Sequence, residues 1–230
     1  MRLRVKPAMT AGRDAENLYF RNKTRTNHMD YNLDNLRDRF NKRGFNTVVC
    51  NDKQEAVHFV LEMFPVNNDM IIGMGNSLTL ETLGLKDIWA EKVSAVYQHT
   101  PGCPDEETKK ALLADLYLTS ANAVSNDGQI VNIDGTGNRV AATCYGPKQV
   151  IYVIGKNKIA ESLEEAVKRA RNTAAVKNAK RYNRKTPCVI TGKCEDCLSA
   201  ECLCSVMTIH RKPPYGLKTT VILVNEDMGI

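Results

Sequence analysis

Residues 116–155 read "LYLTSANAVSNDGQIVNIDGTGNRVAATCYGPKQVIYVIG", and this stretch decides the fold. It opens and closes with apolar runs, "LYLTSA" and "QVIYVIG", of the length typical of buried strands. Between them, "QIVNID" (129–134) has the pattern of a third strand, and Asn-Asp-Gly at 126–128 marks a hairpin turn before it. "NRVAATCY" (138–145) has the pattern of a helix. Strands that alternate with short helices are typical of an α/β fold.

The same alternation continues on both sides of this stretch. Predicted helices cover residues 30–44, 51–64, 77–84, 105–116 and 161–180, and predicted strands cover 45–50, 69–75 and 93–97. The pattern predicts a mainly parallel sheet with helices on both faces. Near the end, "SVMTIHRK" and "TTVILVN" flank a turn that contains two prolines and a glycine, so we expect a C-terminal β-hairpin.

The length of 230 residues allows one core of substantial size. We expect a leader at residues 1–15, which show no periodicity, and a single domain at 16–230. With 43% hydrophobic and 25% charged residues, the composition is that of a soluble globular protein. No apolar run approaches the ~20 residues that span a bilayer, and no signal peptide is visible, so we expect a cytoplasmic protein without membrane contact.

Two loops place glycines between a strand and a helix, "IIGMGNSLT" (71–79) and "IDGTGNR" (133–139). Such loops can present free backbone N–H groups to an anion, although they can also be plain tight turns. Ligands of open α/β sheets bind outside the carboxyl ends of the strands, so we expect both loops to meet in one crevice for a small anionic metabolite. The candidate ligand-binding residues are Gly73, Gly75, Asn76, Ser77, Thr79, Asn122, Gly135, Gly137 and Asn138.

Asp134 and Arg139 add a carboxylate and a guanidinium to the second loop, and they are the candidates for catalysis. For a single residue, the ordinary alternatives are more common: a turn or capping carboxylate for Asp134, and a surface ion pair for Arg139. No nucleophile elbow, zinc-protease motif or catalytic triad is recognisable in the sequence. The residues alone therefore name no reaction.

The segment "PCVITGKCEDCLSAECLC" (187–204) lies in a cysteine-rich loop predicted at 186–204 and holds five of the eight cysteines. Thiols stay reduced in the cytoplasm, which argues against a disulfide framework. The spacing follows neither a strand nor a helix, and four thiolates suit zinc or a [4Fe–4S] cluster. The alternative is that these cysteines pack as small buried side chains.

A basic stretch, "KRARNTAAVKNAKRYNRK" (168–185), leads into the cysteines and contains no acidic residue. Most such stretches are solvated helix faces, and the alternative is an anionic partner such as nucleic acid or an acidic protein surface. Tyr182 and Tyr215 are too few to form a stacking platform for bases, so nucleic acid is the least favoured partner.

Four ordered motifs resemble the LUD-domain, or lactate-utilisation, family of bacterial proteins. They are "GMGNSLTLETLGL", "LTSANAVSNDGQIVNIDGTGNRVAATCYGPKQVIYVIGKNKI", "KTPCVITGKC" and "TTVILVNEDMG", and the resemblance runs from about Tyr19 to the end. It implies a fold similar to that of ribose-5-phosphate isomerase, glucosamine-6-phosphate deaminase and CoA transferases. It also implies a role in oxidation of L-lactate to pyruvate beside iron–sulfur subunits, although the short cysteine-bearing branch has no settled activity.

The resemblance also selects a ligand set among the cysteines, because the family pattern matches Cys188, Cys194, Cys197 and Cys204. Cys202 departs from that pattern and is an extra thiol. "YQHTPGCP" departs as well, so the resemblance assigns no role to His99 or Cys103. The expected cofactor is a [4Fe–4S] cluster or zinc, and the association of the family with iron–sulfur partners favours the cluster.

Three functions follow, and whether the protein is an enzyme stays open. The leading interpretation is a lactate-utilisation protein that binds a small anionic metabolite at the strand ends. The runner-up is a stand-alone sugar-phosphate isomerase or CoA-transferase-like enzyme in which Asp134 serves as base or nucleophile. The third is a nucleic-acid-binding regulator that uses the basic stretch and the cysteines. Iron–sulfur subunits and a second copy of the chain are the protein partners we consider.

Overall fold

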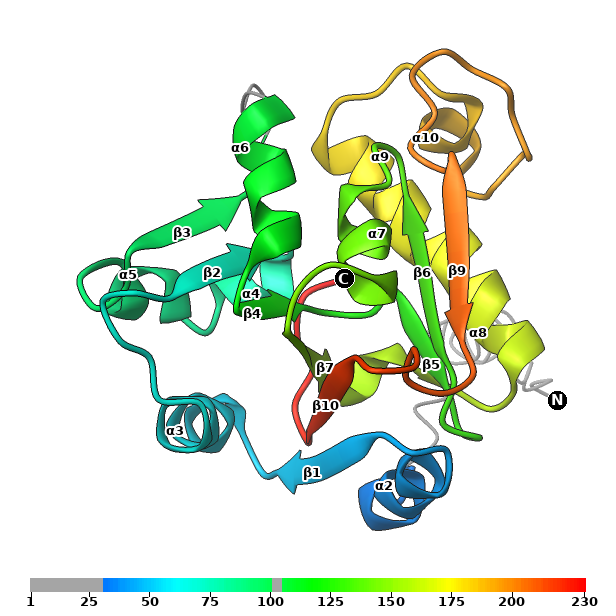
Figure 1. The fold of residues 1–230 in the computed structure, drawn as a ribbon. Helices are drawn as coiled ribbons and strands as arrows, with labels where there is room; N and C mark the ends of the chain where they lie inside the picture. Colours follow the sequence, from blue (N-terminus) through cyan, green and yellow to red (C-terminus); the bar gives the residue numbers. More distant parts are fainter. Residues whose placement is uncertain (1–30, 101–104) are drawn as a thin grey trace, which may run out of the picture. The chain divides into compact units, whose positions relative to one another are not determined.

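Figure 1 shows the fold in a computed structural model, which describes residues 31–100 and 105–230. The predicted leader at 1–15, the start of the family resemblance at Tyr19 and Cys103 lie outside these described residues. Two sheets organise the described chain, one with six strands and one with four. The α/β class predicted from the sequence is confirmed.

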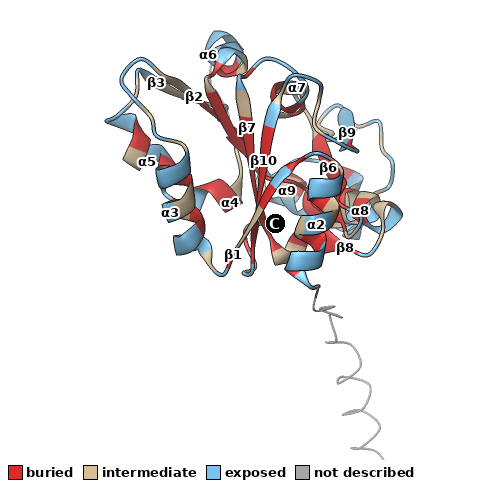
Figure 2. Cartoon of the chain, turned by 60° about the horizontal axis from the view of Figure 1, so that its bottom comes forward, coloured by how far each residue is buried: buried red, intermediate tan, exposed pale blue. Residues whose placement is uncertain are grey.

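The six-stranded sheet is parallel throughout, because every neighbouring pair runs in the same direction. Its central strands are buried along nearly their whole length (Figure 2), as expected for strands covered on both faces. In spatial order the strands are β1 (Asn46–Cys50), β10 (Lys218–Val224), β7 (Gln149–Gly155), β4 (Leu116–Thr119), β2 (Ile71–Met74) and β3 (Ala95–Gln98).

The smaller sheet is mainly antiparallel. The turn at 126–128 pairs β5 with β6, as a short hairpin connection requires, and β9 adds to the other edge of β6. Gly128 has φ +79°, and a Cβ there would lie 3.0 Å from the backbone nitrogen of Phe40, so the turn needs glycine. The spatial order is β8 (Ile159–Ala160), β5 (Ala123–Ser125), β6 (Ile130–Asp134) and β9 (Val206–His210).

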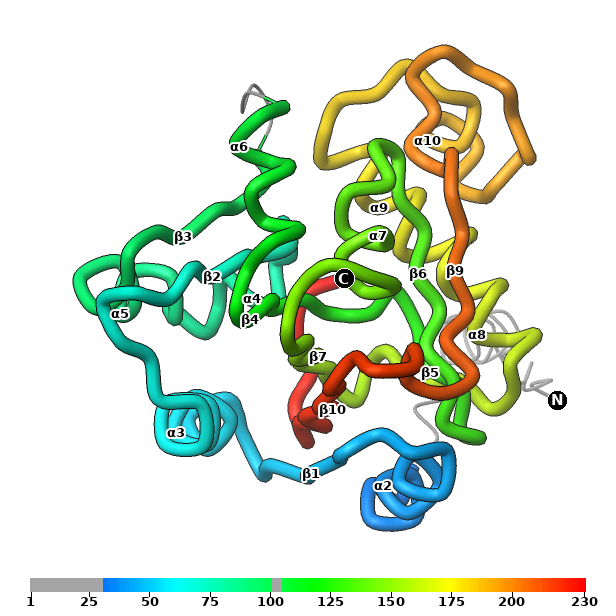
Figure 3. Tube along the Cα trace, in the orientation of Figure 1, coloured from blue at the N-terminus to red at the C-terminus, as the bar shows by residue number. Residues whose placement is uncertain are grey.

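The predicted C-terminal β-hairpin is wrong. Strand β9 pairs with β6 in the small sheet, whereas β10 enters the large sheet between β1 and β7. The run "TTVILVN" is apolar on both faces, which is the pattern of an internal parallel strand, whereas β9 leaves most of its side chains at least partly exposed. The proline-containing turn therefore joins two sheets, and the tube in Figure 3 shows the chain crossing between them.

Helices cover both sides of this arrangement, as predicted. On one face of the large sheet, α3, α4 and α5 pack on Ile72, Leu116 and Ile151. On the other face, α2 and the small sheet pack on Tyr117 and Tyr152, and α8 covers the far side of the small sheet. These helices are α2 (Leu33–Lys42), α3 (Lys53–Met63), α4 (Leu78–Glu81), α5 (Leu85–Ala90) and α8 (Leu163–Arg169).

The remaining helical segments are short, with three to seven residues each. The helix predicted at 161–180 is α8 followed by a π-helical turn, η3 (Ala170–Ala175), and α9 (Val176–Arg181). None of the helices in the described residues is both long and apolar enough to cross a membrane. The others are α6 (Asp105–Lys110), η1 (Ala111–Leu113), α7 (Asn138–Cys144), η2 (Lys156–Lys158) and α10 (Pro187–Thr191), the last within the predicted cysteine-rich loop.

Candidate functional site

A pocket of about 190 Å³ opens where three adjacent strands of the large sheet end. Asn76 and Ser77 follow β2, Ser120 and Asn122 follow β4, and Lys158 follows β7. The chain leaves the large sheet and enters the small one at 120–122, so these residues are held by both sheets. The convergence expected for an open α/β sheet therefore holds for the β2 and β4 loops.

The small sheet supplies the second wall of the pocket. Asp134, Gly135, Asn138 and Arg139 come from the end of β6 and the start of α7. We expected this loop to lie at the carboxyl end of a strand of the open α/β sheet, and that part is wrong, because β6 belongs to the small sheet and is antiparallel to both of its neighbours. The turn at 126–128 reverses the chain, yet the end of β6 still reaches the same pocket.

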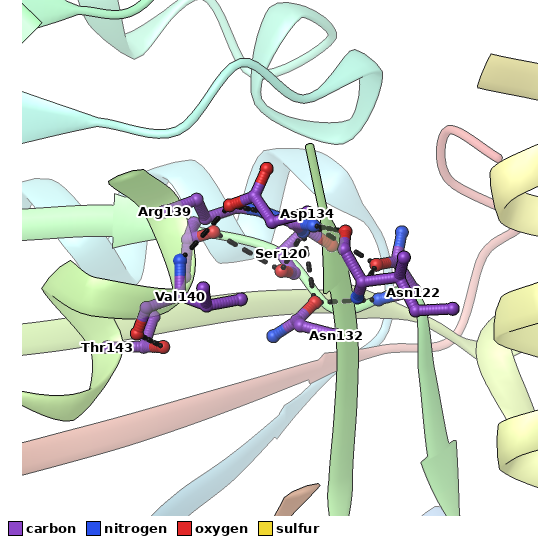
Figure 4. Close-up of polar contacts among 9 residues, drawn as sticks. Ser120, Asn122, Asn132, Asp134, Arg139, Val140 and Thr143 are labelled. Carbon is purple, nitrogen blue, oxygen red and sulfur yellow. Dashed lines mark hydrogen bonds and ion pairs between the residues drawn. The ribbon is translucent and has the colours of Figure 1, made fainter. Parts of the chain in front are cut away.

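Arg139 organises this wall, as Figure 4 shows. Its guanidinium donates to Asn132 Oδ1 and Asn122 Oδ1, each at 3.0 Å, and to the Ile133 carbonyl at 2.6 Å. Asn122 Oδ1 also accepts from the Ile133 amide at 2.7 Å. The planar fork of arginine matches these acceptors, and their geometry supports a positioning role for Arg139.

Asp134 has two contacts that belong to the protein itself. Its Oδ2 accepts from the backbone N–H of Val140 at 3.2 Å, and it lies 3.7 Å from Nε of Arg139. The first contact satisfies one of the free amides at the start of α7, which is how a capping carboxylate acts. Asp134 also lines the pocket, so its carboxylate is within reach of a bound ligand.

Lys158 is the most buried charged group of the site, with an exposed fraction of 3%. Its Nζ donates to Thr79 Oγ1 at 2.8 Å and to Ser120 Oγ at 2.9 Å. Burial, followed by the positive charges of Arg169 and Arg139, lowers the pKa of Lys158 to about 7. No carboxylate in the described part of the chain forms an ion pair with this amine.

Cations from the end of the basic stretch complete the wall. Arg181 stacks on the ring of Tyr182 with 4.6 Å between the guanidinium carbon and the ring centre, and it donates to the Tyr182 hydroxyl at 2.6 Å. Asn76 donates to the same hydroxyl at 3.1 Å. The Nε of Arg181 is buried and has no hydrogen-bond partner among the described residues, and Arg184 lies at the exposed rim.

Four of the predicted ligand-binding residues lie behind the pocket wall. A Cβ on Gly73 would lie 2.6 Å from the ring of Tyr117, so this glycine permits close packing within the sheet. Gly75 donates its N–H to the Leu118 carbonyl, and Thr79 receives the Lys158 amine. Gly137 has φ +85° and precedes α7. The pocket instead contains Asn76, Ser77, Asn122, Gly135 and Asn138, together with Asp134 and Arg139.

Sequence reasoning missed Lys158, Arg181, Arg184 and His99, which all line the pocket. Lysine in "GKNKI" has the pattern of a surface residue, and its position after β7 was the one available signal. The two arginines were assigned to a solvated helix face. The π-helical turn in this helix is a feature common at functional sites, although the sequence does not reveal it.

The predicted cysteine ligands do not form a preassembled metal site. No three His, Cys, Asp or Glu side chains within residues 31–100 and 105–230 lie close enough together to hold an ion. Cys188 contacts the Thr186 hydroxyl at 3.2 Å, and Cys194 accepts from Arg171 at 3.5 Å. Burial first, and then the neighbouring thiols of Cys202, Cys194 and Cys188, together raise the pKa of Cys204 to about 12.

A comparison with models of protein families identifies the family of this chain. The sequence model of the LUD domain matches residues 33–224. A crystal structure of a DUF162 family protein from Deinococcus radiodurans is similar, with 17% identity and a TM-score of 0.44, over 84% of this chain and 95% of that chain. Among curated proteins, none matches the sequence.

Proposed function

Because this chain belongs to the LUD-domain family, we propose that it supports the oxidation of L-lactate to pyruvate and binds a small carboxylate in the pocket at the strand ends. Family membership supports the process, and the pocket supports the class of ligand. The proposed ligand is a short-chain acid such as the substrate or the product of that oxidation.

The observation that carries the proposal is the charge of the pocket wall. The side chains of Lys158, Arg139, Arg181 and Arg184 line the pocket, and the one acidic side chain among its described lining residues is Asp134, which already lies beside Arg139. Arg181 has a second carboxylate, that of Glu81, at 4.0 Å, and Ile230, the last residue of the sequence, also lines the pocket. Buried cations without matching anions are unfavourable, and a bound carboxylate would offset their charge. The exposed guanidinium of Arg184 at the rim is the donor group least committed to the protein.

The size of the pocket supports a small ligand. A volume of about 190 Å³ is below the roughly 300 to 1,000 Å³ of drug-sized sites. Polar groups that fix orientation are present in Ser77, Asn138 and Asn178. A short acid fits this space better than a nucleotide or an intact CoA.

The two alternative functions receive less support. The runner-up needs Asp134 as a base or nucleophile, whereas its contacts with Val140 and Arg139 favour a capping role. In the nucleic-acid alternative the basic stretch would bind phosphates, and its lysines are exposed. Arg169, however, bonds to backbone carbonyls within the fold, and Arg181 lies in the pocket wall. We therefore retain ligand binding as the proposed activity of this site.

Calorimetric titration tests the proposal with L-lactate, pyruvate, acetate and inorganic phosphate as probes. We expect one of the carboxylates to bind, and Arg184→Ala to weaken it by about tenfold or more, since a hydrogen bond to a charged group contributes roughly 1.5 to 3 kcal/mol. Lys177→Ala is the matched control, because Lys177 is exposed on α9 and does not line the pocket. Absence of carboxylate binding, or equal losses in both variants, would contradict the proposal.

Metal binding by Cys188, Cys194, Cys197 and Cys204 stays a separate proposal. The thiols are not preassembled, so a [4Fe–4S] cluster or zinc would have to gather them as it binds. Such a centre would give the protein a point of contact with iron–sulfur subunits. Metal, iron and sulfide analysis of anaerobically purified protein tests this proposal independently of the pocket.

A further inference from the structure

We propose that Lys158 acts as a nucleophile and forms an imine with the carbonyl carbon of a short-chain oxo acid bound in the pocket. The proposal rests on the proposed function, because the acid group of this ligand would use the same cationic wall. It adds a covalent step and narrows the ligand from any small carboxylate to one that carries a ketone or aldehyde.

The position of Lys158 supports this role. The residue ends the short turn η2, directly after the central strand β7, and its amine bonds to Ser120, which also lines the pocket. Lysines normally extend their amine to water, whereas Lys158 has an exposed fraction of only 3%. Lys156, on the same turn, instead reaches Asn225 at the partly exposed surface.

The hydrogen bonds of the amine fit its neutral form. The hydroxyl of Thr79 donates to the Met228 carbonyl, and the hydroxyl of Ser120 donates to the Val153 carbonyl. Both hydroxyl protons are thus used, so toward Lys158 the two oxygens act as acceptors. A neutral amine has two N–H groups and a lone pair, and these two acceptors satisfy both N–H groups. The lone pair is left for an electrophile.

Electrostatics favour the same form. The guanidiniums of Arg139 and Arg169 are the charged groups that act on the amine, and both disfavour an ammonium at this position. Arg169 is held nearby through hydrogen bonds to the carbonyls of Asn122 and Asn157. A lysine that is desolvated beside other cations is the usual form of an activated amine nucleophile. A fully solvated lysine is unprotonated in fewer than about one molecule in a thousand at pH 7.

The pocket selects the class of electrophile. An amine condenses with a ketone or aldehyde carbon, and the guanidiniums of Arg181 and Arg184 select an acid group on the same molecule. A volume of about 190 Å³ favours a chain of a few carbons. Pyruvate, the product of lactate oxidation, has all of these features.

The step is a condensation in which no redox change occurs. The nitrogen of Lys158 attacks the carbonyl carbon, a C–N bond forms, and the C–O bond breaks. The oxygen leaves as water and takes the two hydrogens that the amine gives up. The product is a C=N bond between the lysine and the acid, which hydrolysis can reverse.

Reductive trapping tests the proposal on the full chain. The protein is incubated at pH 7 with pyruvate and sodium cyanoborohydride, and peptides are examined by mass spectrometry for the reduced adduct. We expect at least about tenfold more adduct at Lys158 than at Lys156 or Lys177, because the neutral amine is far more abundant at Lys158. L-lactate, which has no carbonyl, should leave no adduct, and Lys158→Arg should remove the signal.

Titration of pyruvate without reductant separates this proposal from the proposed function. If pyruvate or L-lactate binds but Lys158 is labelled no more than Lys156 and Lys177, the imine is ruled out and the carboxylate site stands. If none of the carboxylates binds and no selective label forms, both proposals fail. Selective labelling that Arg184→Ala weakens would support both.

Discussion

The pocket at the strand ends and the cysteine-rich loop at 186–204 differ in how their side chains are held. In the pocket, Arg139 on α7, Asn132 on β6 and Asn122 in the connection between the two sheets are buried or half-buried and bond to one another. In the loop, the cysteines are half-buried or exposed, and hydrogen bonds such as Thr186 to Cys188 span only two residues. Bonds among buried and half-buried groups fix the first region. The bonds of the loop, both the local ones and those to Arg171 and Asn172, lie at half-buried or exposed positions.

This difference indicates which parts of the molecule are preorganised. The pocket is built where strands that are distant in sequence end side by side, so its geometry follows from the packing of the sheets. The segment after α10 has neither helix nor strand up to β9. We expect the pocket to bind its ligand with little rearrangement, and the loop to change shape if it binds metal.

Replacement of Arg139 gives the largest expected effect and tests the rigidity of the pocket. Arg139→Ala should lower the free energy of unfolding by about 3 to 5 kcal/mol, because it leaves buried oxygens and the Asp134 carboxylate without their partner. Urea unfolding followed by circular dichroism measures this loss. Arg139→Lys should recover only part of it, since an ammonium cannot bond to all the acceptors of the fork.

Arg171 is the matched arginine beside the cysteine-rich loop. It bonds to Cys194 and Asp196 at the surface. Arg171→Ala should change the free energy of unfolding by less than about 0.5 kcal/mol, as for most exposed ion pairs. Similar losses of free energy of unfolding in Arg139→Ala and Arg171→Ala would show that the two regions are equally ordered and would contradict the difference described above.

The same contrast explains what the sequence could predict. The strands around the pocket were found because "QVIYVIG" and "DMIIGMG" are apolar runs, and the turn at 126–128 has strong local chemistry. The position of β10 was missed, because the order of strands in a sheet depends on contacts between distant segments. An apolar run on both faces was the signal that it belonged inside the parallel sheet.

Within the site, the strand-end rule placed Asn122 at the pocket, and Asp134 lies there too although its strand β6 is not part of the parallel sheet. It did not find Lys158, because burial of a lysine depends on how closely α4 and the β4 loop approach it in space. It also did not distinguish Ser77, which lines the pocket, from Gly75 and Thr79, which lie behind it. Local patterns identify loops, and packing decides which side chain of a loop faces the ligand.

The pH dependence of stability gives an intermediate effect and tests the burial of Lys158. Its pKa is about 7 in the folded protein and near 10.4 when unfolded. Between these values the unfolded chain binds the extra proton, so the destabilisation caused by Lys158 is largest below pH 7 and disappears as pH rises above 10. The difference in free energy of unfolding between Lys158→Met and the parent should therefore change in favour of the parent by about 2 kcal/mol between pH 7 and pH 9.

Urea unfolding of both proteins at several pH values measures this change. The variant also loses the hydrogen bonds to Thr79 and Ser120, which changes its free energy of unfolding by an amount that varies little with pH. The change of the difference with pH is therefore the informative quantity. Lys177→Met is the control, because its side chain is exposed on α9. A difference between Lys158→Met and the parent that stays constant over this range would mean that the amine is charged in the fold.

Single cysteine substitutions have the smallest expected effects on the stability of the metal-free protein, and they test most directly how the loop differs from the pocket. Cys197→Ser and Cys202→Ser should each change stability by less than about 0.5 kcal/mol, because neither side chain is fully buried.

The two variants should differ after anaerobic loading with iron and sulfide or with zinc. The spacing of Cys194 and Cys197 allows two sulfurs to bind one centre, so Cys197→Ser should lose the metal and Cys202→Ser should retain it. In the metal-free fold, however, Cys202 is among the thiols that act on Cys204, and Cys197 is not. Metal loss from Cys202→Ser alone would therefore show that the loop is as preorganised as the pocket.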